Sequence, residues 1–291
     1  MPQPPTPHRT VLITGGTDGI GRGVAEARLS LGDTVIVTGS TAAKGAALAG
    51  AAERLGAADR FRFIQADLSS LAVAVNVIKD VSAGYQSLDA LVLCANRQSP
   101  KRQTTPEGLE YCFSLYYLSR YLLTHGLRSL FDAAEAPVII DVSAPGTKLG
   151  SVHFDDLQSE RSYSGIRAQA QCARANDLLG VAYGEHPSSK ASFVIYHPGF
   201  TATRGGLEHM AQPARTLVSV LSRVAAKPID KAAAPIVEWI SDPPRQPLTA
   251  VDRGKVVDLT QPTFDKANAE RLNSLTRDLV NDKLGPNDLN P

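Results

Sequence analysis

Residues 9–31 read RTVLITGGTDGIGRGVAEARLSL, and this stretch decides the fold. Arg9–Ile13 is a short apolar strand pattern, Thr14–Gly21 is rich in glycine, and Arg22–Leu31 has a helical pattern. A strand, a glycine-rich turn and a helix in this order form a pyrophosphate cradle. The glycines permit a tight turn, let backbone approach the phosphates, and let the helix pack closely on the strand. The helix N-terminus adds unpaired N–H groups and the positive end of its dipole, so we predict a dinucleotide site rather than a flexible loop.

Apolar segments alternate with helical patterns along the rest of the chain. The expected strands, which suit burial on both faces, are Thr34–Thr38, Phe61–Gln65, Ala90–Cys94, Val138–Val142, Phe193–Tyr196 and a further one near Gly254–Leu259. The expected helices are Arg22–Leu31, Lys44–Leu55, Leu71–Tyr85, Glu107–Phe131 and Ile166–Gly184. This alternation predicts an α/β fold, a single-domain doubly wound parallel sheet of the Rossmann type with helices on both faces.

The 291-residue chain reads as one domain with short ends. We expect a flexible leader at 1–8, the domain at 9–282 and a tail at 283–291. A formal charge of +1 and 43% hydrophobic residues describe an ordinary globular surface without the basic patch that nucleic acid requires. No apolar run approaches the ~20 residues that span a bilayer, and no signal sequence opens the chain. The three cysteines and six histidines lack metal-ligand spacing, so we expect reduced thiols and no metal site. From the charge and the short apolar runs we expect no nucleic-acid or membrane partner, and we expect a cytoplasmic location.

The glycine spacing Thr-Gly-x-x-x-Gly-x-Gly at Thr14–Gly21 resembles that of the short-chain dehydrogenase/reductase family. Asp67-Leu68 resembles the family's adenine-side element. Lys148–Leu157 is close to a segment of its retinol-dehydrogenase-like branch. Pro198–Thr203 matches the Pro-Gly-x-x-x-Thr motif that holds the nicotinamide, and the chain is therefore identified as a member of this family.

The resemblance also implies a substrate lid and a mode of assembly. The lid falls at about 201–227, where the pair Gly205-Gly206 would serve as a hinge, although an ordinary loop and helix fit equally well. Family members often pair through their fourth and fifth helices, so a homo-oligomer is possible, and the sequence leaves that open.

Cofactor contacts follow from the resemblance and from the end of the second strand. The assigned residues are Gly15, Thr17, Asp18, Gly19, Ile20, Gly21, Arg22, Ser40, Thr41, Lys44, Asp67, Leu68, Ala95, Pro198, Gly199, Phe200, Thr201 and Thr203. NAD-preferring enzymes need a carboxylate after the second strand to bind the ribose 2′-hydroxyl. Here Gly39 leaves space, and Ser40 and Thr41 supply hydroxyls instead. We therefore expect NADP(H), with Arg22 and Lys44 near its 2′-phosphate unless they are simply solvated. Against this, Asp18 stands where many NADP-preferring relatives are basic, and no Arg occupies position 40.

The family's catalytic residues are missing. Its members reduce ketones with a Ser, a Tyr and a Lys, usually helped by an Asn. The Tyr gives the proton, the Lys lowers the pKa of the Tyr, and the Ser positions the carbonyl. Alignment on the flanking motifs places Tyr116 at the Asn, Ala144 at the Ser, Gln169 at the Tyr and Ala173 at the Lys. All four catalytic positions are therefore substituted.

Ser143, Tyr163, Gln169 and Tyr116 remain as pocket candidates. On a helix, Tyr163 and Arg167 would share a face, but Arg does not tune a phenol as Lys does, so we expect a pocket wall rather than a relocated acid. Ser143 is one residue out of register and should face the opposite side of its strand, its hydroxyl bonded to backbone. Gln169 can donate a hydrogen bond to a carbonyl but no proton at neutral pH. Tyr116 either lines the site or belongs to the core.

Two functions fit these residues. The first is an atypical NADPH-dependent ketoreductase acting on a bulky, aromatic polyketide-like ketone, as in antibiotic tailoring. Loss of the general acid costs about 10²–10⁴-fold, which a substrate with a phenolic hydroxyl beside its ketone can restore by protonating its own alkoxide. The alternative is a non-catalytic NADP(H)-binding pseudoenzyme or redox sensor. The intact nicotinamide motif at Pro198, Gly199 and Thr203 favours the reductase, because a sensor has less need to hold the reactive ring.

Overall fold

A single twisted sheet forms the centre of the protein, seen here in a computed structural model that describes residues 8–199 and 228–285. In the described residues the sheet has the strand order β3-β2-β1-β4-β5-β6-β7-β8, with β8 alone antiparallel. The strands are β1 Thr10–Thr14, β2 Thr34–Gly39, β3 Phe61–Gln65, β4 Ala90–Leu93, β5 Val138–Val142, β6 Ser192–His197, β7 Leu248–Asp252 and β8 Lys255–Val256. The order reverses between β1 and β4, so the predicted doubly wound fold is confirmed, and the crevice for a ligand belongs beyond the carboxyl ends of these two strands.

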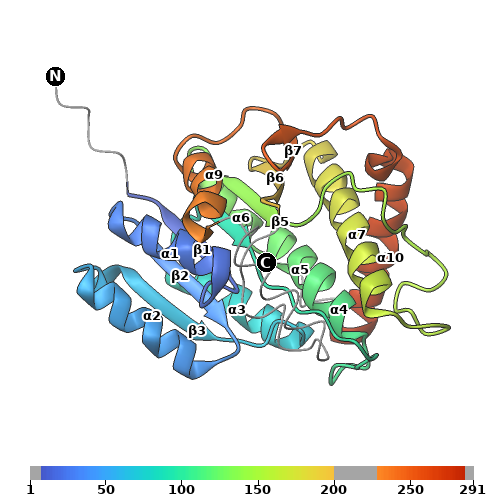
Figure 1. The fold of residues 1–291 in the computed structure, drawn as a ribbon, viewed down its shortest axis with the longest axis horizontal. Coiled ribbons are helices and arrows are strands. Elements are labelled where there is room, and N and C mark those ends of the chain that lie inside the picture. The colour runs from blue at the N-terminus through green and yellow to red at the C-terminus, as the bar shows by residue number, and fades with distance from the viewer. Residues whose placement is uncertain (1–7, 200–227, 286–291) are drawn as a thin grey trace.

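Helices cover both faces of the sheet (Figure 1). One face carries α1 Gly19–Ser30, α2 Ala42–Arg54 and α9 Ile229–Ser241, and the other carries α3 Leu71–Gly84, α5 Ser119–Gly126, α6 Arg128–Ala133 and α7 Gly165–Glu185, with α10 Lys266–Leu284 packed against α7. Strand β1 shows how the sheet serves two cores. Leu12 belongs to the cluster under α3, α5 and α7, whereas Val11 and Ile13 belong to the cluster under α1, α2 and α9. Alternate burial of this kind explains the continuous apolar strands.

The strand expected near Gly254–Leu259 is present only as the short β8, which is antiparallel, and the longer strand before it was not predicted. The last parallel strand is Leu248–Asp252, and only Lys255–Val256 pairs after it, antiparallel. Arg253 and Gly254 both have positive φ, 51° and 84°, which closes a two-residue hairpin and reverses the chain.

Helix α9 was not predicted. It carries Pro235 inside its span, and proline removes a backbone donor and so argues against a helix from sequence alone. The helix forms because Ala232, Ala233, Ile236 and Ile240 are buried against the sheet and α1. Tertiary packing here outweighs local preference.

The helix expected at Glu107–Phe131 is divided. Glu110 ends an extended segment, and its side chain accepts the N–H groups of Cys112 (2.9 Å) and Phe113 (2.6 Å), so α4 begins only at Tyr111. A π-helical turn, Ser114–Leu118, follows, and a break at Leu127 separates α5 from α6. In the π turn the carbonyl of Tyr116 accepts a hydrogen bond from the Asn176 amide at 2.9 Å. Such turns are frequent at functional sites.

The last described helix, α10, reaches into the expected tail. It runs from Lys266 to Leu284, so the predicted tail over 283–291 begins within α10. Within residues 8–199 and 228–285, no helix combines the length and the apolar character needed to cross a membrane.

Candidate functional site

The glycine-rich turn between β1 and α1 has the shape of a phosphate cradle. Gly15 has φ +63°, and a Cβ built on it would lie 2.9 Å from the backbone of Ala95. A Cβ on Gly21 would lie 2.7 Å from the Gly15 carbonyl oxygen. Both positions are therefore restricted to glycine by backbone packing. Helix α1 starts at Gly19, so its first-turn N–H groups face the same edge of the sheet where a pyrophosphate would bind. The residues present fit a dinucleotide.

Asp18 and Lys44 link this cradle to the second strand. Asp18 caps α1 by accepting the N–H of Gly19 at 2.8 Å, and Lys44 Nζ lies 2.6 Å from its other oxygen. Burial acts to raise the pKa of Asp18, but the hydrogen bonds from Lys44 and Gly19 outweigh it and hold that pKa below its usual value. Arg22 pairs with Glu26 at 2.9 Å. A 2′-phosphate would therefore have to draw Lys44 from Asp18.

The space left by Gly39 has a different occupant from the one expected. A Cβ there would lie 2.8 Å from the Thr17 hydroxyl oxygen, so Gly39 makes room for Thr17 rather than directly for a phosphate. Ser40 and Thr41 are exposed at the end of β2. Both residues are therefore accessible at the start of α2, the helix that carries Lys44.

The remaining cofactor candidates lie at the carboxyl ends of other strands. Asp67, after β3, accepts the N–H of Ser69 at 3.0 Å. Ala95, after β4, donates its N–H to the Thr14 hydroxyl at 3.2 Å. Pro198 and Gly199 follow β6. The parallel strands thus bring the described candidates to one edge. Phe200, Thr201, Thr203 and the expected lid at 201–227 lie outside the described residues.

Gln169, which the sequence alignment assigned to the family's Tyr, is paired with a residue that the sequence had not singled out. Asn96, two residues beyond Cys94 in the loop after β4, donates through Nδ2 to Gln169 Oε1 at 3.2 Å. Gln169 Nε2 donates in return to Asn96 Oδ1 at 2.9 Å. This reciprocal amide pair joins the β4 loop, next to the cofactor cradle, to the second turn of α7. It can donate and accept hydrogen bonds but cannot supply a proton.

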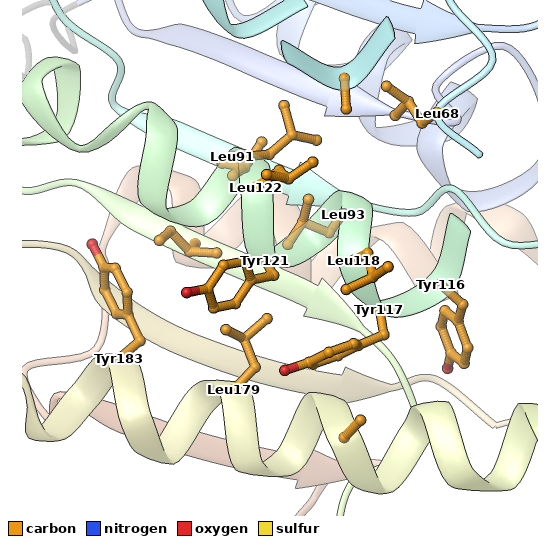
Figure 2. Packing of buried hydrophobic residues seen from close by; sticks show 14 of the residues in the cluster. Leu68, Leu91, Leu93, Tyr116, Tyr117, Leu118, Tyr121, Leu122, Leu179 and Tyr183 are labelled. Atoms are coloured by element: carbon orange, nitrogen blue, oxygen red, sulfur yellow. The ribbon is translucent and has the colours of Figure 1, made fainter. Parts of the chain in front are cut away.

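Tyr116 and Ser143 meet below this edge. The phenol oxygen of Tyr116 lies 3.1 Å from the Ser143 hydroxyl, and both side chains are buried. Ser143 thus bonds a side chain rather than backbone, and it faces the layer of α5 and α7 as Ala144 does. The expected opposite orientation was wrong because β5 ends at Val142 and the strand alternation stops there. Figure 2 shows Tyr116 continuing the row of buried aromatic rings of Tyr117 and Tyr121.

Arg120 and Asp141 form a buried ion pair behind Tyr116. The Arg120 guanidinium lies 4.4 Å from the centre of the Tyr116 ring and donates to the Ala95 carbonyl at 3.2 Å. Burial raises the pKa of Asp141 to about 6 even though Arg120 lowers it, and burial raises the pKa of Tyr116 to about 12. Tyr116 is therefore a neutral hydrogen-bonding group and a poor acid. A charged residue inside the strand pattern VIID is the sequence signal that could have revealed this pair.

Arg174 and Asp177 form a second buried pair, next in the chain to Ala173. Their closest atoms are 3.1 Å apart. Arg174 donates to the carbonyls of Thr147 and Ala144, and Asp177 accepts the N–H of Gly146 at 3.1 Å. Burial raises the pKa of Asp177 to about 7, although Arg174 opposes that shift. The pair therefore holds the loop after β5, which includes Ala144.

Tyr163 lies just before α7, which starts at Gly165, and its hydroxyl is bonded to backbone. The shared helical face that was considered for Tyr163 and Arg167 therefore does not form. The Tyr163 hydroxyl donates to the Ser99 carbonyl at 3.1 Å. Burial, and then the charge of Glu110, raise its pKa further above the ordinary value for tyrosine.

A family model, described as short chain dehydrogenase, matches residues 9–155. The chain belongs to the short-chain dehydrogenase family. It is 30% identical to the human polyprenol dehydrogenase over 172 residues, which cover 58% of this chain and 52% of that protein. The chain thus spans about half the length of that relative.

Two further similarities extend over most of the chain. It is 28% identical over 283 residues to the Streptomyces protein named "Putative daunorubicin C-13 ketoreductase DnrU", covering 93% of this chain and 94% of that protein. The crystal structure of a short chain dehydrogenase from Burkholderia cenocepacia in complex with NADP has a TM-score of 0.62 and 20% identity, and the match covers 84% of this chain and 97% of that one. The structural similarity shows the shared fold.

Proposed function

We propose that this protein is an NADPH-dependent ketoreductase that acts without the family's acid, on a bulky aromatic ketone. The proposal rests on the glycine cradle, whose backbone approaches at Gly15 and Gly21 leave no room for a side chain, together with the alignment that assigns Ala144, Gln169 and Ala173 to the family's catalytic positions. The cofactor supplies hydride when bound, and the protein orients the reactants. Similarity to the Streptomyces ketoreductase over nearly the full length of both chains supports an aromatic polyketide as substrate.

The proton in this proposal comes from the substrate. A phenolic hydroxyl beside the ketone is already hydrogen-bonded to the carbonyl oxygen. As hydride adds to the carbonyl carbon, the phenol proton moves to the forming alkoxide, and water then reprotonates the phenolate. The neutral Gln169 amide and the buried, high-pKa Tyr116 fit this scheme, because neither has to change its charge.

The test compares one substrate with its methyl ether. We expect NADPH consumption with a peri-hydroxylated aromatic ketone, and a fall of about 10²–10⁴-fold when that hydroxyl is methylated, as for loss of a general acid. Ser143→Ala and Tyr163→Phe should each lower kcat far less. A loss of about 10³-fold from Tyr163→Phe alone would identify a relocated acid. Tight NADPH binding with no turnover across a panel of such ketones would instead favour the pseudoenzyme.

We further propose that Lys44 sets the preference for NADPH. It lies in the first turn of α2, shortly after Ser40 and Thr41 in the chain, and is paired with Asp18, so a 2′-phosphate can exchange with that carboxylate. Fluorescence titration should show NADPH binding about tenfold or more tighter than NADH, since a charge-assisted hydrogen bond to phosphate is added. Lys44→Ala should remove most of this difference, whereas Arg54→Ala, at the far end of α2, should not. Equal affinities in the unmodified protein would contradict the proposal.

A further inference from the structure

Helix α10 adds a layer outside the sheet and the helices that cover it. It packs on α7, and α7 packs in turn on β6 and β7 (Figure 1). The start of α10 lies at the end of α7, where Lys266 and Glu185 are 2.7 Å apart. A doubly wound domain is complete with one layer of helices on each face of its sheet. Helix α10 therefore covers a surface of α7 that such a domain leaves on the outside.

One stripe of α10 is buried. Its residues recur at helical spacing and are each no more than 1% exposed: Ala269, Leu272, Thr276 and Val280. On the other helix, Leu178, Leu179 and Ala182 line a narrow gap together with Leu272. Tyr117, from the π turn, lines the same gap. We call Tyr117, Leu178, Leu179 and Ala182 the α7 face, and it contains no charged side chain.

A buried pair of hydroxyl groups fixes α10 on this face. The hydroxyl oxygens of Tyr117 and Thr276 are 2.8 Å apart, and both side chains are fully buried. Tyr117 follows Tyr116 in the π turn (Figure 2). A buried hydroxyl that lacks a partner is costly, so the α7 face requires a polar group at this one place and apolar groups around it. Helix α10 supplies both.

The outer side of α10 differs from its buried stripe. It exposes two acidic and two basic side chains: Glu270, Arg271, Arg277 and Asp278. Charged side chains are depleted from the centres of protein interfaces, because pairing would strip water from them. Helix α10 therefore replaces an apolar surface with a charged one that disfavours association.

We propose that α10 takes the place of a partner subunit. It occupies the α7 face, so the intact chain does not pair through α7, and a second copy of the chain binds there only when α10 leaves. Two copies related by a twofold axis would bring the α7 face against an identical face, which buries apolar side chains of both. The inference concerns assembly and is independent of the proposed ketoreductase activity.

The test compares matched substitutions on the two sides of α10. Leu272→Asp places a carboxylate in the buried stripe, which should release α10, because a charge cannot be buried there without a partner. Light scattering after gel filtration should then show the mass rise from 30.9 kDa to about twice that value, as for a twofold pair. Leu275→Asp makes the same change on the same helix, where the side chain is 36% exposed, and should leave the mass at 30.9 kDa.

Hydrogen exchange shows whether α10 alone has been released. In the unmodified protein the amides of α10 and α7 should be protected to a similar degree, whereas Leu272→Asp should lose protection in α10 and keep it in β1 to β6. Val280→Asp, at the other end of the stripe, should behave as Leu272→Asp does.

Three results would overturn the proposal. The first is a mass of two chains for the unmodified protein. The second is a single-chain mass for Leu272→Asp or Val280→Asp when α10 has lost its protection. The third is loss of protection throughout the sheet in both variants, which would make α10 a part of the domain core rather than a cover on it.

Discussion

The glycine cradle and the buried ion pair of Arg120 and Asp141 lie near the same edge of the sheet, but the first depends on backbone atoms and the second on side chains. The cradle works through backbone, since its glycines are required by close approach of main-chain atoms at Gly15 and Gly21. The ion pair works through side chains, with Arg120 and Asp141 buried where charges are costly. Because the cradle depends on backbone geometry, it can be retained when side chains elsewhere in the site change. Proton chemistry belongs to individual side chains, so it can be lost while the fold remains.

The largest expected effect is the loss of stability when the buried pair of Arg120 and Asp141 is broken. Arg120→Met leaves the Asp141 carboxylate buried without its partner, and should destabilise the protein by about 3–5 kcal/mol in urea unfolding at pH 8. The loss should be smaller near pH 5. Asp141 already has its pKa raised to about 6 by burial, with Arg120 opposing, and a protonated carboxyl tolerates burial better. Arg120→Met combined with Asp141→Asn should recover part of the loss.

A surface pair provides the control for this prediction. Arg62 and Asp80 are 2.6 Å apart but exposed, so Arg62→Met should cost no more than about 1 kcal/mol. Similar losses from Arg62→Met and Arg120→Met would show that the buried pair is not special.

Next in size is a change that breaks the cradle. Gly21→Val places a side chain 2.7 Å or less from the Gly15 carbonyl, so NADPH affinity should fall by about 100-fold or more, roughly 2.7 kcal/mol. Circular dichroism should show the helices retained. Gly50→Ala, on the open side of α2, should leave NADPH binding unchanged. Normal binding by Gly21→Val would place the dinucleotide elsewhere.

A smaller expected effect is the change of folding stability with pH that comes from the buried carboxyl of Asp177. Burial raises the pKa of Asp177 from 3.8 to about 7 in the folded chain, with Arg174 acting against the shift. Between these pH values the unfolded chain has released a proton that the folded chain keeps, so this group lowers stability as pH rises. The contribution is at most about 1.4 kcal/mol per pH unit.

Asp177→Asn removes this titration. The stability of the variant relative to the unmodified protein should therefore improve as pH rises from about 4 to 7, measured by urea unfolding at several pH values. Gln103→Ala, which removes no titratable group from an exposed position, should show a constant difference. A constant difference for Asp177→Asn as well would mean that the carboxyl is not held protonated by the fold.

The sequence alone was enough to predict the fold and the position of the glycine-rich turn. Strand and helix periodicity and glycine spacing are local signals, so β1 to β6 and the turn at Gly15–Gly21 could be predicted from neighbouring residues. The same signals failed at α9, where Pro235 hides a helix that packing stabilises, and at the hairpin of Arg253 and Gly254. The divided helix after Glu110 was missed because a side-chain cap decides where it begins.

Only the tertiary structure decided what surrounds the residues that the alignment assigns to the catalytic positions. The sequence places Gln169 at the family's Tyr, but its partner Asn96 is 73 residues away in the chain. Arg120 on α5 and Asp141 on β5 likewise meet only because the fold brings these two elements together. A sequence pattern reports which residues follow one another, whereas hydrogen bonds and buried charges depend on which residues the folded sheet brings within about 3 Å of each other.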